Sequence, residues 1–547
     1  MKNCVNCQAQ FTINDSEKNF YDQLKVPEPT CCPACRMQRR FAFRNERYMY
    51  HSKCAFSGKT IISLYDPKSP YVVYDYDTWW SEQWSGLSYG KDFDFSRSFF
   101  EQFQELRQAV PRMNMSNMNS VNSLFTNHAA DNKNCYMLVA CEKNEDCLYG
   151  KLVQSCKNCM DCNFIYECEL CYECVSCYNC YCSAWIHDCH NCSNCYFSKE
   201  LRGCNDCFGC FNLRNKKHCI FNKQYAEEEY KKIMREFDRG SFRQTENMKK
   251  TVSEQFARMI VRDVHQNKCE NCTGDYIEQS KNCLNCFDTT KGQDSWYLTD
   301  ALEPINCMDS CFIYYKPELC LETLSTLKLY DVLYSMYIYW CSHVMYSEYC
   351  YNSQNLFGCV GLKKNEYCIL NKQYAPEEYE KLKSRIIEHM GETGEFGEFF
   401  PVKFSAFGYN ETVAQEYFPM TKQQILERGW IWRDEEDKAA AYQGPKYDLP
   451  DLIDEIPIDI TDKILTCEKT GKLYKIIPHE LAFYKKMGLP IPRECPDYRH
   501  AARMKARNPR ALWPRTCAKC GDEIWTSYSP DRTETVYCEK CYLGEVY

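Results

Sequence analysis

The residues with the clearest chemistry are two sets of four cysteines, one near each end of the chain. Each set consists of two CxxC pairs: Cys4/Cys7 with Cys32/Cys35, and Cys517/Cys520 with Cys538/Cys541. A short CxxC loop can turn both of its sulfur atoms toward one ion, so two such loops supply the four thiolates of a tetrahedral zinc site. The spacing therefore predicts two bound Zn²⁺ ions, one at each end of the chain.

The two ends are copies of one another. At a constant shift of 463 residues, without a gap, residues 4–74 align with residues 467–537. Each copy has two lobes, and in each copy one lobe has lost ligands. The four ligand positions of the altered lobe hold Cys54, Ser57, Asp75 and Thr78 in the N-terminal copy, and Cys467, Thr470, Cys495 and Tyr498 in the C-terminal copy, so only the cysteines are retained. We expect the altered lobes to lack metal, and the register selects Cys32 over its neighbour Cys31 as the ligand.

The first lobe resembles a known family. Its CxxC pair, then Phe20-Tyr21, then a Pro-x-x-Cys-Pro-x-Cys-Arg run ending at Arg36, is similar to a family described as zinc ribbons. More broadly, nearly the whole chain resembles a group of cysteine-rich zinc-ribbon proteins from ultra-small environmental bacteria. The resemblance implies zinc and implies no particular activity. Its weakest match is the lobe with Thr470 and Tyr498.

The middle of the chain carries a short repeat. Written in rows of fifteen from Cys141, the cysteines fall into columns, one of which runs Cys147, Cys162, Cys177, Cys192 and Cys207. Stacked identical residues at a fixed short period are typical of a solenoid. We therefore predict a β-solenoid that bends between columns. The ending 208–232 returns as 357–381, which predicts a second solenoid.

The solenoid cysteines are better interpreted as packed thiols than as metal ligands. One column runs Cys141, Cys156 and Cys171 and continues as Ile186 and Leu201, which cannot bind metal. A neutral thiol behaves as a small hydrophobic group, so these residues are interchangeable inside a core. For four further cysteines, at the entrance of the second solenoid, the sequence leaves two interpretations: a third zinc quartet, or irregular coils that cap the solenoid. These cysteines are Cys269, Cys272, Cys283 and Cys286.

Composition narrows the classes of function. The 547-residue chain has a formal net charge of -8 and 42 cysteines, with neither a leader-like start nor a long apolar run. We expect a cytoplasmic protein that does not enter the membrane, where cysteines stay reduced. An overall negative charge disfavours binding of polyanions along the whole chain and leaves only local basic patches for such contacts.

Basic residues beside the zinc lobes suggest one such patch in each copy. Small zinc folds that present arginines beside aromatic residues often contact RNA phosphates and bases, although solvated helix faces are an equally good interpretation. The candidate residues for contact with RNA or a ribonucleoprotein are Arg36, Arg40, Arg44, Arg499, Arg503 and Arg507. The leading hypothesis is a non-enzymatic zinc-binding scaffold. The alternatives are a protein–protein assembly scaffold, or a metal-handling or redox protein that uses the cysteine columns.

The predicted fold class is mainly β with helical caps, in which duplicated zinc-ribbon-like modules flank two cysteine-rich short-repeat β-solenoids. The first half should contain an N-terminal two-lobed module (1–80), an aromatic helical connector (81–125), the first solenoid (126–222) and a helical cap and linker (223–265). The second half should contain the second solenoid (266–370), a helical cap (371–430), an acidic linker (431–463) and the C-terminal two-lobed module (464–547).

Overall fold

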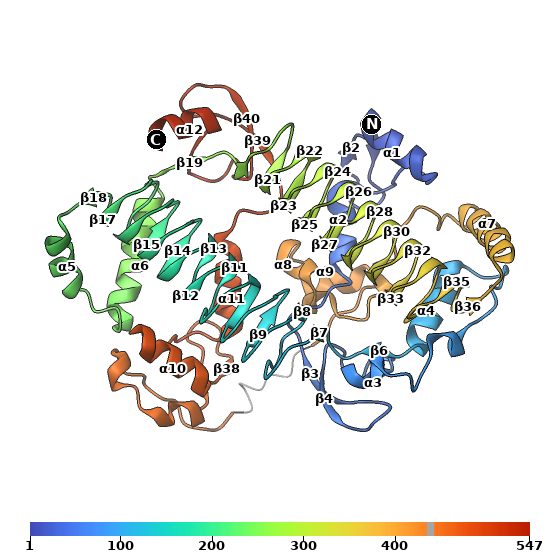
Figure 1. The fold of residues 1–547 in the computed structure, drawn as a ribbon, viewed down its shortest axis with the longest axis horizontal. Coiled ribbons are helices and arrows are strands. Elements are labelled where there is room, and N and C mark those ends of the chain that lie inside the picture. The colour runs from blue at the N-terminus through green and yellow to red at the C-terminus, as the bar shows by residue number, and fades with distance from the viewer. Residues whose placement is uncertain (435–441, 547) are drawn as a thin grey trace.

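The computed structural model describes residues 1–434 and 442–546, and it confirms the predicted fold class. Two stacks of parallel strands lie in the two halves of the molecule, and the cysteine-rich terminal modules pack around them (Figure 1). The first stack already begins with β7 at Asn117, before the predicted boundary at 126. The predicted acidic linker, 431–463, lies partly outside the described residues. No helix in the described ranges is long and apolar enough to cross a bilayer.

The first solenoid is built from parallel strands that climb in steps of twelve residues. Lys151 pairs with Asn163, and Cys195 pairs with Cys207, which pairs in turn with Cys219. Its strands are β7 (Asn117–Met118), β8 (Ala129–Ala130), β9 (Tyr136–Val139), β10 (Leu148–Gln154), β11 (Asn163–Tyr166), β12 (Glu169–Tyr172), β13 (Val175–Tyr178), β14 (Tyr181–His187), β15 (Ser193–Lys199), β16 (Asn205–Phe208) and β17 (Lys217–Ile220). The predicted fifteen-residue coil is therefore wrong, and the true coil has twelve residues.

The second solenoid has the same step and forms two parallel sheets. The first sheet contains β20 (Gln266–Asn267), β21 (Gly274–Glu278), β23 (Cys286–Thr290), β25 (Thr299–Leu302), β27 (Cys311–Tyr314), β29 (Leu324–Leu327), β31 (Met336–Tyr339) and β33 (Glu348–Tyr351). The second contains β22 (Lys281–Leu284), β24 (Gln293–Trp296), β26 (Ile305–Met308), β28 (Glu318–Leu321), β30 (Tyr330–Leu333), β32 (Ser342–Met345), β34 (Gln354–Phe357) and β35 (Glu366–Ile369). One coil is longer, because Ile305 pairs with Glu318 thirteen residues on.

The coil bends because nearly every third residue has a positive φ. In the first solenoid these residues recur from Asn119 to Asn212 with φ between 47° and 65°, and the residue after each of them is buried or half-buried and points inward. No Val, Ile or Thr occupies such a position among the described residues. Side chains branched at Cβ clash in this left-handed region, so their exclusion is expected. Because inward residues recur at every third position, cysteines align at a spacing of fifteen residues as well as twelve. Fifteen residues are one coil of twelve plus one three-residue side of the next coil.

The buried thiols lie within hydrogen-bond distance of backbone carbonyl oxygens inside the coil. The Cys147 thiol lies within hydrogen-bond distance of two carbonyl oxygens, those of Glu145 at 3.4 Å and Cys156 at 3.5 Å. Ser183 replaces cysteine in the same column, and its hydroxyl donates to the Tyr181 carbonyl at 2.9 Å. A serine can take this place only if the position needs a small hydrogen-bonding group rather than a thiolate ligand. The interpretation of these columns as packed thiols therefore fits the structure.

A short hairpin and a helix follow each stack. At the end of the first stack, β17 turns back into the antiparallel strand β18 (Lys223–Gln224), and α5 (Glu227–Arg235) packs on β17. The second stack ends in the same way with β36 (Lys372–Gln373) and α7 (Pro376–Glu392). The antiparallel hairpin ends the stack of twelve-residue coils, and the helix that follows it covers the last coil.

The two terminal modules share one plan, element by element. The N-terminal module contains β1 (Lys2–Asn3), β2 (Gln10–Phe11), α1 (Asp15–Leu24), α2 (Pro33–Phe41), β3 (Tyr50–Lys53), β4 (Thr60–Ser63), β5 (Val73–Tyr74) and α3 (Tyr76–Trp80). The C-terminal module contains β37 (Leu465–Thr466), β38 (Leu473–Tyr474), α10 (Pro478–Met487), α11 (Pro496–Ala506), β39 (Trp513–Thr516), β40 (Glu523–Thr526), β41 (Thr535–Tyr537) and α12 (Glu539–Val546). Seven of these eight pairs have their first residues 463 apart; β41 starts one residue earlier.

The remaining elements connect these parts. Between the N-terminal module and the first stack lie η1 (Gly86–Tyr89), α4 (Phe99–Ala109) and β6 (Arg112–Met113), and between the stacks lie α6 (Phe242–Phe256) and β19 (Ile260–Arg262). After the second stack come η2 (Val402–Phe404), η3 (Tyr409–Glu411), α8 (Val413–Tyr417), α9 (Lys422–Glu427), η4 (Ile453–Glu455) and η5 (Ile458–Asp462). Strand β6 pairs with β5, and β19 pairs with β41, so each module is tied to the connector before one solenoid.

Candidate metal centres

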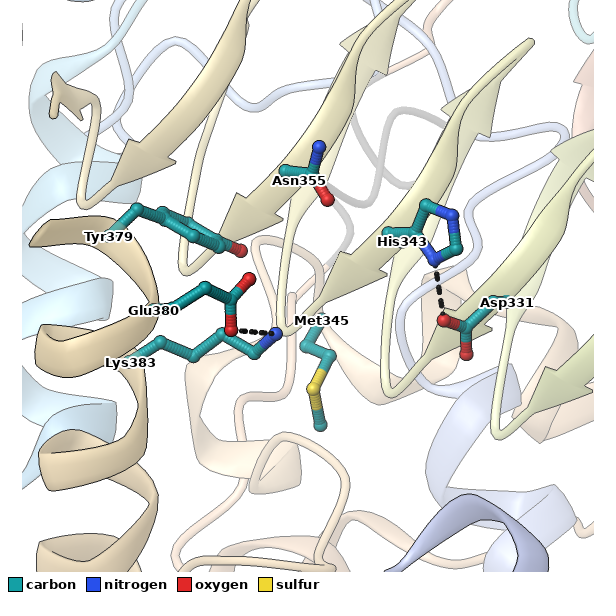
Figure 2. A pocket seen from close by; sticks show the side chains of 7 residues that line it. All are labelled: Asp331, His343, Met345, Asn355, Tyr379, Glu380 and Lys383. Carbon is teal, nitrogen blue, oxygen red and sulfur yellow. Dashed lines mark hydrogen bonds and ion pairs between the residues drawn. The ribbon is translucent and has the colours of Figure 1, made fainter. Parts of the chain in front are cut away.

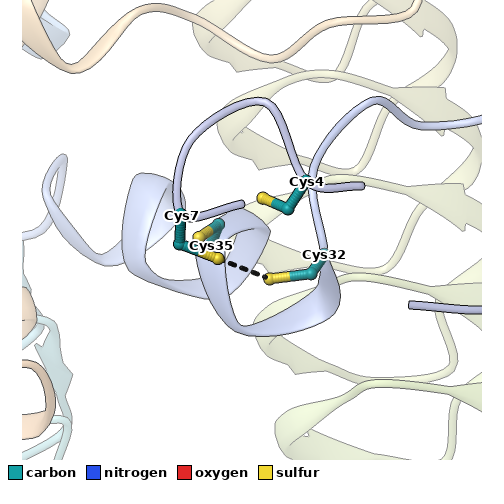
Figure 3. A group of neighbouring side chains, drawn as sticks. All are labelled: Cys4, Cys7, Cys32 and Cys35. Atoms are coloured by element: carbon teal, nitrogen blue, oxygen red, sulfur yellow. Dashed lines mark hydrogen bonds between the residues drawn. The ribbon is translucent and has the colours of Figure 1, made fainter. Parts of the chain in front are cut away.

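The four N-terminal cysteines come together as one quartet. The ligand atoms of Cys4, Cys7, Cys32 and Cys35 all lie within 4.8 Å of one another. Figure 3 shows Cys4 and Cys7 on the loop between β1 and β2, facing Cys32 and Cys35 at the start of α2. Cys31 stays outside the group, as the sequence register predicts. Four sulfur atoms at this spacing could hold one ion with tetrahedral coordination.

The C-terminal quartet has the same construction in the other lobe. The sulfur atoms of Cys517, Cys520, Cys538 and Cys541 also lie within 4.8 Å of one another. Cys517 and Cys520 belong to the turn between β39 and β40, while Cys538 and Cys541 stand at the start of α12. The structure therefore brings together both complete quartets that the sequence predicts.

Helix N-termini and backbone amides favour thiolates in both quartets. Cys32 is the N-cap of α2, where the helix dipole stabilises negative charge. A hydrogen bond from the Cys35 thiol lowers the pKa of Cys32 to about 5. Burial acts against ionisation of Cys517, but the backbone N–H groups of Cys520 and Cys538 lower its pKa to about 6. Each quartet thus contains a thiol whose pKa is held below the usual value for cysteine, which favours the thiolate form that binds a cation.

All four knuckles have the same backbone, including the two that have lost cysteines. Each has a positive φ four residues after its first cysteine, at Gln8, Gly58, Gly471 and Gly521. In every one, the N–H of that residue donates to the carbonyl of the first cysteine at 2.9 Å. The duplication is therefore retained in the backbone where the ligands have changed.

The lobe around Cys54 is closed by hydrogen bonds. Asp75, which stands where Cys538 stands in the other copy, accepts from the hydroxyls of Ser57 at 2.9 Å and Thr78 at 2.7 Å. Its own N–H donates to the Cys54 sulfur at 3.3 Å. Burial opposes ionisation of Asp75, but its hydrogen bonds with Cys54, Thr78 and Ser57 hold its pKa below the usual range. Every altered residue has a partner within the lobe.

The other altered lobe keeps only part of a quartet. The hydroxyl of Thr470 lies 3.7 Å from the sulfur of Cys495, and Tyr498 is exposed. Cys467 and Cys495 are both buried. These two cysteines do not belong to any group of three or more potential ligands among the described residues.

The third candidate quartet is not assembled. Cys269, Cys272, Cys283 and Cys286 belong to consecutive coils, and the described structure does not gather them into a common group. The thiols of Cys269 and Cys272 contact backbone carbonyls of their own and the next coil, as at Cys147. Of the two interpretations left open by the sequence, the structure supports capping coils.

The six arginines proposed for RNA contact are buried, which contradicts the expected exposed basic face. The residues concerned are Arg36, Arg40, Arg44, Arg499, Arg503 and Arg507. Arg40 on α2 binds Glu322 at 2.9 Å, and Arg503 on α11 binds Asp161 at 2.8 Å. Their role is to attach the two modules to the solenoids. The sequence could not show this, because most of their acidic partners, such as Glu322 and Asp161, lie hundreds of residues away along the chain.

A shallow pocket lies between the second solenoid and α7 (Figure 2). His343 pairs with Asp331 at 2.8 Å, and Lys383 pairs with Glu380 at 3.5 Å. The charged groups of this pocket thus face each other in two pairs along its wall. This arrangement lacks the convergence of a nucleophile, a base and an orienting group that a hydrolytic site needs.

A further group of potential ligands was not predicted. Asp188 and Glu200 lie in the first solenoid and His265 precedes β20, yet their ligand atoms come within 4.8 Å of one another. The sequence offers no spacing signal for this group, since His265 is 65 residues from Glu200.

Comparisons with known proteins place the chain in no family. No family model matches it, and no curated protein does. Among solved structures, it is similar to a protein from Desulfovibrio desulfuricans G20 described as a "putative acetyltransferase". That match has 9% sequence identity, covers 51% of this chain and 82% of the other, and has a TM-score of 0.10. A likeness this weak carries no argument about fold or activity.

Proposed function

We propose that this protein is a non-enzymatic scaffold whose two terminal modules each hold one Zn²⁺ ion. The two assembled cysteine quartets carry the proposal. Four thiolates complete the tetrahedral shell of zinc, so such a site has no open position for a substrate or a reactive water. A closed site is typical of structural zinc, which stabilises the fold around it.

The position of the quartets supports a structural role. Cys32 and Cys35 begin α2, the helix that carries Arg36 and Arg40 into contact with the second solenoid. An ion bound to these cysteines would fix the start of the helix and hence the direction of its arginines. The resemblance to zinc ribbons remains a prediction that agrees with this role.

Partners are proposed from the solenoids rather than from the basic helices. Because the candidate arginines are committed to internal ion pairs, RNA contact through them is not part of the proposal. Tyr181, Tyr330 and Trp340 are exposed aromatic side chains on the solenoids. Aromatic residues are enriched at protein interfaces, which favours protein partners. Reproducible partners that persist after nuclease treatment would support this; partners lost with RNA would contradict it.

The zinc proposal is tested by metal content in a matched pair of variants. Protein purified anaerobically without added zinc should contain sulfur-coordinated zinc, and Cys517→Ser should remove one equivalent. Cys54→Ser is the control, since Cys54 occupies the corresponding place in a lobe closed by hydrogen bonds. Elemental analysis with X-ray absorption gives both the count and the ligand type. Iron in place of zinc, or an equal loss in both variants, would overturn the proposal.

A further inference from the structure

The joint between the two solenoids contains a polar cluster that the proposed scaffold function does not use. Asp188 and Glu200 stand on consecutive coils of the first solenoid, and His265 lies in the segment that leads into the second. The Nε2 atom of His265 lies 2.9 Å from Oε1 of Glu200 and 3.9 Å from Oδ2 of Asp188. We propose that Asp188, Glu200 and His265 form a third metal site that holds a divalent ion, Zn²⁺, through one imidazole nitrogen and two carboxylate oxygens.

The imidazole is oriented as in known metal sites. Its other nitrogen, Nδ1, lies 3.0 Å from Oδ1 of Asp275, a residue of the second solenoid. Asp275 is fixed in turn by the backbone N–H of His265 and by the hydroxyl of Ser527 from the C-terminal module. A histidine that binds metal usually donates its second ring N–H to a carboxylate, which leaves the first nitrogen free to coordinate.

Both carboxylates have one oxygen occupied and one directed at the imidazole. Oδ1 of Asp188 accepts from the hydroxyl of Tyr276 at 2.9 Å, while Oδ2 lies between Nδ1 of His187 at 2.5 Å and Nε2 of His265 at 3.9 Å. Oε2 of Glu200 lies 3.3 Å from the guanidinium of Arg202, which leaves Oε1 facing the same nitrogen. Each of the three ligands therefore has an outer partner on its far atom, and the three near atoms converge.

His187 lies beside the same cluster. Its Nδ1 atom is 2.5 Å from Oδ2 of Asp188, and its Nε2 atom is buried without a hydrogen-bond partner. Buried polar atoms are nearly always satisfied, so this unpartnered nitrogen beside the cluster indicates a missing component.

The other half of the molecule shows that this cluster is not required by the fold. At the shift of 149 residues that superposes Phe208 on Phe357, Asp188 and Glu200 correspond to Tyr337 and Tyr349. Those two tyrosine rings are stacked 4.7 Å apart and fill the same place in the second solenoid. Buried charges cost free energy that an aromatic pair avoids. The joint therefore keeps acidic groups and a histidine where packing alone would favour aromatic rings.

The mixed set of ligands suits zinc. Imidazole nitrogen and carboxylate oxygen are both zinc ligands at about 2.0 Å, and three protein ligands leave one position for water. A bound ion would join Asp188 and Glu200 of the first solenoid to His265 ahead of the second, supported by Asp275 and Ser527. It would thus fix the angle between the two stacks.

The test is zinc stoichiometry and ligand type in the full chain. After equilibration with excess Zn²⁺ and desalting, the wild-type protein should hold three ions, and His265→Gln should hold two. His343→Gln, which changes an exposed histidine paired with Asp331, should still hold three. Glu200→Gln repeats the test with a smaller change if His265→Gln fails to fold. Saturation of the wild type at two ions, or three ions in His265→Gln, would overturn the proposal.

Ligand type separates this site from the two cysteine quartets. X-ray absorption at the zinc edge of the wild-type protein should show nitrogen or oxygen neighbours at about 2.0 Å beside sulfur at about 2.3 Å. In Cys517→Ser the sulfur contribution should fall, while the nitrogen and oxygen shell contributed by this site should persist. Sulfur neighbours alone in the wild type would mean that the cluster is an ion-free group of buried ion pairs around a protonated His265.

Discussion

Single residues decide whether a knuckle binds metal or closes on itself. The lobes around Cys54 and Cys517 share one backbone, and the first of them replaces three ligands with Ser57, Asp75 and Thr78. Asp75 takes the N-cap of α3, the place that Cys538 holds before α12. An N-cap carboxylate satisfies the amides at a helix start without an ion, so the helix can be kept after the metal is lost.

Buried ion pairs are the second feature at this scale. Arg503 is 5% exposed and binds Asp161, which is completely buried. Arg503→Ala should lower the free energy of unfolding by about 3–5 kcal/mol, because it removes a partner of a buried carboxylate. Arg243→Ala, at an exposed arginine of α6, should change it by less than about 0.5 kcal/mol. Urea unfolding of both variants measures the difference, and equal effects would contradict the contact.

Glu348 gives the stability a pH dependence. Burial disfavours its charged form, but Arg107 and Arg112 lower its pKa to about 2, against a usual 4.5. A lowered folded-state pKa stabilises the protein above about pH 4.5, and this stabilisation is lost as the pH falls toward 2. The shift corresponds to about 3 kcal/mol.

Unfolding free energies of the wild type and Glu348→Gln at pH 6, 4 and 3 test this assignment. The variant should be less stable at pH 6, because it loses the charge that balances Arg107 and Arg112. It should also lose less stability than the wild type as the pH falls. Parallel curves for the two proteins would assign the acid sensitivity to other carboxylates.

At the scale of elements, the solenoid is set by a three-residue rule. One residue faces outward, the next has a positive φ and bends the chain, and the third points into the core. Four such triplets make one coil of twelve residues. The sequence carries this signal in two ways: cysteines spaced by three, and the exclusion of branched residues from the bending position.

Replacing a bending residue tests the rule. Lys143 has a φ of 57° and an exposed side chain. Lys143→Val should lower the free energy of unfolding by about 1–2 kcal/mol, since a side chain branched at Cβ is strained there. Lys143→Gly should be tolerated, and Lys133→Val, at an outward position without positive φ, should have a small effect. Thermal unfolding of the three variants measures the contrast, and equal losses at Lys143 and Lys133 would refute the rule.

The prediction of the fold from sequence succeeded where residue type fixes geometry. CxxC spacing and the ungapped copy of the ends located both quartets, and stacked cysteines indicated a solenoid. The predicted coil length of fifteen residues was wrong, because inward cysteines spaced by three residues form columns at intervals of both twelve and fifteen residues. The sequence predicts exposed arginines that the structure buries, because their charge is visible in the sequence while Asp161 and Glu322 are not visible as their partners. His265 was missed for the same reason, since only the folded joint brings it to Glu200.

Each terminal module is attached to the solenoid that is farther from it along the chain, an arrangement that we call crossed attachment. The N-terminal module binds the second solenoid through Arg40 and Glu322, and the C-terminal module binds the first through Arg503 and Asp161. One part of the two interfaces corresponds residue for residue: Arg44 lies over Phe312 and hydrogen-bonds Ser325, as Arg507 lies over Phe164 and hydrogen-bonds Ser176. Each terminal module therefore packs on the solenoid that is more distant along the chain (Figure 1).

Crossed attachment predicts that the covalent link to the C-terminal module is dispensable once the protein has folded. A protease site inserted between Gln443 and Gly444, which are exposed, would separate this module from the rest of the chain. The cut module should stay bound, because Arg503 and the pairing of β41 with β19 hold it without the linker.

Size-exclusion chromatography after cleavage distinguishes the outcomes. A single peak that contains both fragments is expected, and the same cut in Arg503→Ala should release the module more readily. Removing zinc with a chelator should weaken the cut complex further, because the ligand Cys538 directly follows β41 and the ligand Cys541 lies in α12. Release of the module from the wild-type protein at ordinary ionic strength would mean that the linker, rather than the buried arginines, holds the two halves of the molecule together.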